Sequence, residues 1–110
     1  MVDADRGNPL YSSRADDLEF RDAIDAFVIT LAERIDRIQD AEVHGDFKQV
    51  AQLCGPLMAE AEQLGFSPLA RLAHVVCACA DEEKGEEMHR QLLELTALAQ
   101  RVRLGHRGAV

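Results

Sequence analysis

The chain has 110 residues and a net charge of −8, and 47% of its residues are apolar while only 5% are aromatic. This length is sufficient for one domain, whose core can form without a metal or disulfides. The acidic charge disfavours nucleic acid as a partner, because it repels the phosphate backbone. No apolar run reaches the roughly 20 residues that span a bilayer, so we expect no membrane segment.

The N-terminus and the cysteines favour a reducing compartment. The first residues, Met1 to Asp5, are acidic and lack the hydrophobic segment of a signal peptide. Cys54, Cys77 and Cys79 do not make a disulfide framework. Since free thiols are usual in the cytoplasm, the sequence predicts a cytoplasmic protein.

The first part of the chain divides into a leader and a long helix. Residues 1–15 contain glycine, asparagine, proline and serine, which interrupt any periodicity, although Leu10 and Tyr11 could dock the leader on the body. The helix is expected to begin at Asp16 or Asp17, either of which can cap it. The β-branched residues at 28–30 admit a short break in it. Its apolar positions recur at helical spacing; they are Phe20, Ile24, Phe27, Leu31, Ile35 and Ile38.

A turn at residues 44–46 precedes a second helix. Gly45 suits the left-handed position just after a helix end. Asp46 can cap the next helix, and Gln49 three residues later completes a capping-box pattern. Gly65 ends this helix, whose apolar stripe consists of Phe47, Val50, Leu53, Leu57, Ala61 and Leu64.

Two further helices complete the pattern. Ser67 is expected to cap the third helix, with Pro68 at its first position. An acidic junction at residues 81–87 leads into the fourth helix, which Gly105 is expected to end. The apolar face of the third helix consists of Leu69, Leu72, Ala73, Val76 and Ala80, and that of the fourth consists of Met88, Leu92, Leu95, Ala99 and Val102.

These elements predict an all-α protein. Short connections force neighbouring helices to run antiparallel, so the expected architecture is an up-and-down four-helix bundle. The bundle is assigned to residues 16–104. It follows a partly docked leader or short extra helix at 1–15 and precedes a tail at 105–110.

No residue pattern points to catalysis, a metal or a cofactor. His74 and Cys77 share a helix face, but Cys79 points about 160° away from Cys77. A closed zinc site needs four converging ligands, so the thiols are better interpreted as small core residues. No cysteine lies at a predicted helix N-terminus or among cations, which would lower its pKa.

Several landmarks along the chain resemble a known family. They are Asn8-Pro9-Leu10-Tyr11-Ser12-Ser13, Ala15-Asp16-Asp17, Phe27-Val28, Leu31, Arg34-Ile35, Gly45-Asp46, Val50-Ala51-Gln52-Leu53 and Gly65-Phe66. In this order, across residues 8–104, they resemble the histidine phosphotransfer (HPt) domains of two-component phosphorelays, which are four-helix bundles. The resemblance implies a response-regulator receiver domain or a histidine kinase as partner.

The chain departs from the family at its chemical motif. The family pattern is His-x-x-Lys-Gly, with a further glycine ten residues after the histidine. Counting back from Gly65 places Gly55 at the phosphoacceptor position, Met58 at the lysine and Ala59 at the motif glycine. Phosphotransfer needs an imidazole nucleophile, and a nearby cation would help stabilise the phosphoryl charge. Gly55 and Met58 supply neither group.

Pro56 adds a structural departure next to Gly55. A proline inside a helix lacks the N–H that would bond the carbonyl of Gln52, and its ring clashes there at a cost of about 3 kcal/mol or more. The sequence therefore predicts a bend near residues 52–56, unless the helix absorbs the proline.

The resulting functional prediction is a non-phosphorylatable, HPt-like binding protein. Its partner-binding residues are predicted to be Gly55, Pro56, Met58, Ala59 and Glu62, because the family binds receivers through this face. One alternative is a structural or oligomerisation module that pairs through Leu93 and Leu98. Another is an active phosphotransfer protein that uses a histidine outside the motif, such as His74 or His89.

Overall fold

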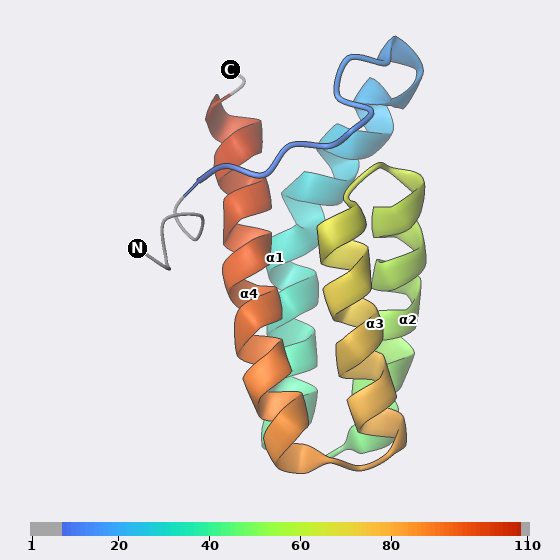
Figure 1. Ribbon diagram of the computed structural model, residues 1–110, viewed down its shortest axis with the longest axis vertical. Coiled ribbons are helices and arrows are strands. Elements are labelled where there is room, and N and C mark those ends of the chain that lie inside the picture. Colours follow the sequence, from blue (N-terminus) through green and yellow to red (C-terminus); the bar gives the residue numbers. More distant parts are fainter. Residues whose placement is uncertain (1–7, 109–110) are drawn as a thin grey trace.

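Four α-helices pack side by side in the computed structural model, which describes residues 8–108 (Figure 1). A 3-10 turn, η1 (Leu18–Phe20), leads into α1 (Arg21–Val43), which is followed by α2 (Phe47–Gln63), α3 (Ser67–Asp81) and α4 (Gly85–Gly108). Each helix contacts its neighbours in sequence, and α4 closes the ring against α1. The predicted all-α, antiparallel up-and-down bundle is confirmed. No helix among these residues is both long and apolar enough to cross a membrane.

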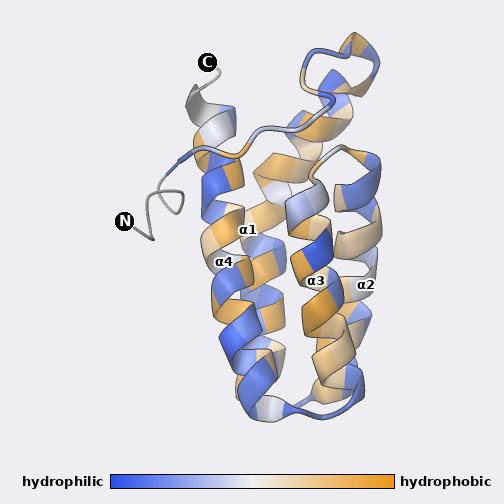
Figure 2. Cartoon of the chain, in the orientation of Figure 1, coloured by the Kyte–Doolittle hydropathy of each residue, from blue (hydrophilic) through white to orange (hydrophobic). Residues whose placement is uncertain are grey.

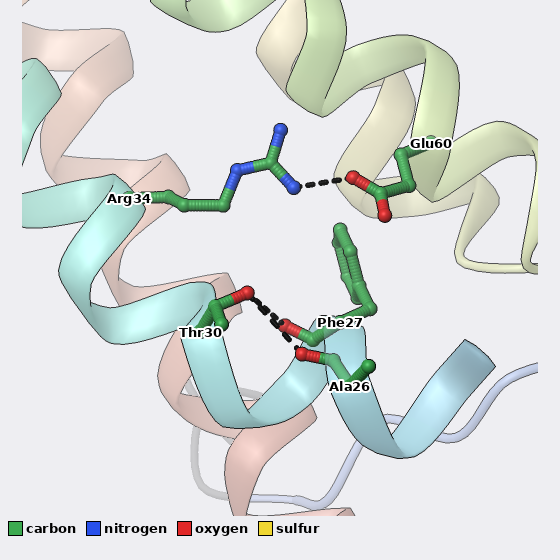
Figure 3. A network of polar contacts seen from close by, with 5 residues as sticks. All are labelled: Ala26, Phe27, Thr30, Arg34 and Glu60. Atoms are coloured by element: carbon green, nitrogen blue, oxygen red, sulfur yellow. Dashed lines mark hydrogen bonds and ion pairs between the residues drawn. The ribbon is translucent and has the colours of Figure 1, made fainter. Parts of the chain in front are cut away.

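The cap predicted for the first helix lies on the short turn before it: Asp17 caps η1, whereas the N-cap of α1 is Phe20, which offers no side-chain bond. The carboxylate of Asp17 accepts a hydrogen bond from the Glu19 amide at 3.0 Å, and the chain passes through η1 into α1. The β-branched run does not break α1, which is continuous to Val43. The hydroxyl of Thr30 donates to the carbonyls of Ala26 and Phe27 in the preceding turn (Figure 3).

The three turns between helices share one backbone conformation, in which one residue has a positive φ. Gly45 and Gly65 have φ values of +67° and +86°, as the predicted helix stops require, and Glu83 takes the same role at +55°. The residue after each turn donates its amide to a carbonyl five positions back, at 2.8–3.0 Å. The carboxylate of Asp46 accepts from the Gln49 amide at 3.0 Å, so the predicted cap of α2 is confirmed.

The cap predicted for the third helix is wrong by one residue. Ser67 already lies within α3, and the N-cap is Phe66, which offers no side-chain bond. Phe66 is buried, and its carbonyl accepts the Ala70 amide at 3.0 Å, so burial of the ring fixes where the helix begins. Pro68 consequently lies in the first turn, one position later than predicted.

The predicted helix stop at Gly105 is also wrong. α4 continues through this residue to Gly108. The leader crosses α4 here, and a Cβ at position 105 would lie 2.7 Å from the carbonyl oxygen of Leu10. Because glycine has no Cβ, Gly105 allows the backbone of the leader to approach α4 closely. The leader is docked from Asn8 onwards, whereas residues 1–7 and 109–110 lie outside the described residues.

The core lies between the helices and is almost wholly aliphatic. Its aromatic pair is Phe27 of α1 and Phe66, whose ring centroids are stacked 5.6 Å apart. Figure 2 shows hydrophobic residues along α3, whereas the first half of α4 is mainly hydrophilic. At the edge of the core, the guanidinium of Arg34 lies over the Phe27 ring and pairs with Glu60 of α2 at 2.5 Å (Figure 3).

Candidate functional site: the face of α2 and α3

Gly55 lies inside α2 and faces open space. A Cβ built at this position would have no atom within 4 Å outside its immediate helical neighbourhood. A side chain at position 55 would therefore project outward without meeting another helix. An exposed imidazole could occupy this position in the fold, but glycine leaves it without a functional group.

Pro56 lies inside α2 without interrupting it. The proline and Gln52 are both exposed, so water can bond the Gln52 carbonyl that Pro56 cannot serve. The proline ring normally disfavours helical geometry at the preceding residue by clashing partly with its Cβ, which Gly55 lacks. Gly55 thus removes one clash of the proline ring, and α2 continues through Pro56 without a break.

A shallow groove of about 670 Å³ runs beside this pair, between α2 and α3. Three of the five predicted site residues line it, namely Met58, Ala59 and Glu62. Gly55 lies one turn before Met58 on the same side of α2, while Pro56 is exposed outside the groove lining. The opposite wall comes from α3, which the sequence did not predict as part of this site. It consists of Ala70, Arg71, His74 and Val75.

The groove combines an apolar surface with two charges. Val75 is 38% exposed although it is apolar, and this departure from the buried stripe of α3 was the signal available in the sequence. Within the described part of the chain, neither Glu62 nor Arg71 has an ion-pair partner. Both side chains are thus available to an external charged group.

The four histidines differ in their surroundings. His74 is exposed and lines the groove, one turn after Arg71. His89 Nδ1 lies 2.7 Å from the Glu42 carboxylate, and His106 Nδ1 lies 3.6 Å from that of Asp25. His44 Nδ1 lies 2.8 Å from the carbonyl of Asp40 at the end of α1. His74 is therefore the histidine that shares a surface with the predicted site.

The cysteines are placed for packing. Cys54 is fully buried, and burial together with the neighbouring Cys77 raises its pKa to about 12. Burial likewise raises the pKa of the Cys77 and Cys79 thiols above their ordinary range. Since the thiolate is the nucleophile, this environment disfavours cysteine chemistry at neutral pH. Residues 8–108 contain no cluster of three or more histidine, cysteine or acidic side chains arranged to hold a metal ion.

Comparison with known proteins finds no relative of the chain. No protein-family model matches the chain, and neither a curated protein nor a solved structure is significantly similar to it. The likeness to histidine phosphotransfer domains therefore depends on the sequence landmarks described above.

Proposed function

We propose that the chain is a non-phosphorylatable HPt-like protein that binds a receiver domain or a histidine kinase through the face of α2 and α3. The observation that carries the proposal is the groove formed by Met58, Ala59 and Glu62 with α3. These residues come from the segment in which the resemblance places the family's motif, and they border a surface open to a partner.

The chemistry of the face supports binding without phosphoryl transfer. Position 55 opens to solvent but carries no side chain, and position 58 carries a thioether instead of a cation. An exposed apolar surface rimmed by charges is typical of protein contact sites. In a phosphorelay, a partner that docks here would be occupied and would exchange no phosphoryl group.

Calorimetric titration of the chain with each receiver domain and kinase of the source organism tests the proposal. Ala59→Arg places a bulky cation on an exposed position of the groove and should weaken binding at least about tenfold, by removing complementarity at the contact. Ala26→Arg makes the same change at an exposed position of α1 and should leave binding unchanged. Absence of binding to every candidate would refute the proposal.

The oligomerisation alternative has one supporting observation. Leu93 of α4 is 56% exposed, whereas Leu98 is half-buried and packs against the core. A face carrying an exposed leucine can pair between chains. Light scattering at several protein concentrations distinguishes the two functions, because a stable dimer that Leu93→Glu dissociates would favour a structural module.

His74 supports the second alternative, an active protein with a relocated phosphoacceptor. It is exposed in the groove beside Arg71, a cation that could attract a phosphoryl group. Incubation with a phosphorylated receiver distinguishes this function, since acid-labile phosphate that His74→Gln abolishes would replace the non-phosphorylatable account with this one.

A further inference from the structure

A cavity separate from the groove lies beneath the docked leader. Its volume is about 410 Å³, and its walls come from the leader, the start of α1 and the end of α4. No residue that lines this cavity also lines the groove of α2 and α3. The volume falls within the range of pockets that enclose small molecules, roughly 300–1,000 Å³.

The leader wall of the cavity is fixed at both of its ends. On α4, the Leu10 amide donates to the Arg101 carbonyl at 2.9 Å. At the turn between α2 and α3, the Ser13 amide donates to the Gly65 carbonyl at 2.9 Å, and the Ser12 hydroxyl donates to the Leu64 carbonyl at 2.5 Å. The leader can therefore hold a wall of the cavity in place before any ligand arrives.

The floor and the rim of the cavity differ in chemistry. Val28, Phe66 and Val102 are buried and give an apolar floor. Polar groups from α1 and α4 stand at the rim, where the carboxylate of Asp25 faces His106 at 3.6 Å. Arg21 also lines the cavity and has no ion-pair partner among residues 8–108. Arg21 is thus a cation at the rim that no acidic side chain of the described residues pairs with, whereas Asp25 is paired with His106 only when that imidazole is protonated.

We propose that the cavity binds small amphipathic carboxylates, with the apolar chain on the floor and the carboxylate on the Arg21 guanidinium. A guanidinium binds a carboxylate through charge-assisted, often paired hydrogen bonds. An amine head group fits less well, because it would lie beside the Arg21 guanidinium, which repels it. The apolar floor favours a hydrocarbon tail over a polar metabolite.

Titration of the ¹⁵N-labelled protein with octanoate, followed by amide chemical shifts, tests this site. Saturable shifts should appear around the cavity, at Leu10, Ile24, Val28, Val102 and Gly105. Octanol has the same chain without the charge and should bind at least about tenfold more weakly, because it cannot pair with Arg21.

Two arginine variants separate the site from general adhesion. Arg21→Gln removes the charge at an exposed position and should weaken octanoate about tenfold while leaving octanol unchanged. Arg37→Gln, at an exposed position remote from the cavity, should change neither. Absence of saturable octanoate shifts at the cavity, or equal octanoate affinity in Arg21→Gln and the parent, would overturn the proposal.

Discussion

Gly55 and Gly105 both lie inside helices, yet they occupy opposite environments. At Gly55 a Cβ would meet open space, whereas at Gly105 it would lie 2.7 Å from a backbone oxygen of the leader. The first glycine accommodates its neighbour in sequence, Pro56, and the second accommodates a segment distant in sequence. The face of α2 and α3 is thus open at Gly55, while the leader covers the end of α4 at Gly105.

The largest expected effect on this comparison comes from Pro56→Ala. It restores an N–H for the Gln52 carbonyl and removes a ring clash inside α2, so the free energy of unfolding should rise by about 3 kcal/mol. Urea unfolding measures the change. Pro68→Ala is the matched control, because a proline in the first turn of α3 removes no helical bond and should shift stability little. An equal gain in both variants would contradict the account of Pro56.

Gly105→Ala should have the opposite sign and a smaller size. The new methyl would press on the Leu10 carbonyl, and this overpacking exceeds the better helix propensity of alanine, so stability should fall by about 1–2 kcal/mol. Gly85→Ala is the control, since its Cβ would meet the Phe47 ring at an ordinary 3.7 Å. A stabilised Gly105→Ala variant with unchanged Leu10 and Tyr11 amide shifts would show that the leader does not press on α4.

Ser12→Ala should weaken the attachment of the leader by about 1 kcal/mol. The hydroxyl is buried, donates to the Leu64 carbonyl and accepts the Arg14 amide at 2.9 Å, so its loss leaves two backbone groups without a partner. Thermal unfolding and proteolysis of the leader report the effect. Ser13→Ala, at an exposed position, is the control, and its stability should stay within about 0.5 kcal/mol of that of the parent. Equal losses of stability in the two variants would count against this role of Ser12.

Gly55→Ala should give the smallest effect, and its sign should depend on Pro56. With Pro56 present, the added Cβ meets the proline ring and offsets the gain in helix propensity, so stability should change little. In the Pro56→Ala background the same substitution should stabilise by about 1 kcal/mol, because open space surrounds the position. A double-mutant cycle measures this coupling, and strictly additive effects would show that the two residues are independent.

The sequence predicted the parts of the fold that depend on local chemistry. The apolar spacing gave the four helices, and the cap at Asp46 and the left-handed stops at Gly45 and Gly65 lie where the side chain or φ values require. Asp17 caps the 3-10 turn that leads into α1. These features involve residues only a few positions apart, so the chain order contains them directly.

The predictions that failed depend on contacts between distant segments. Gly105 has the composition of a helix stop, but the leader that packs on it lies almost a hundred residues earlier. Ser67 resembles a cap, yet burial of Phe66 sets the helix start. The α3 wall of the groove was missed for the same reason, because the position of α3 beside Met58 and Ala59 is a property of packing.

We propose above all that the open face of α2 and α3 binds a phosphorelay partner and accepts no phosphoryl group. The most direct test mixes the chain with each receiver domain and histidine kinase of the source organism, phosphorylated with radioactive phosphate. Gel filtration then follows the radioactive label and the protein together. The account predicts co-elution with at least one partner while all the label stays on that partner. Acid-labile label on this chain, or co-elution with none of them, would contradict it.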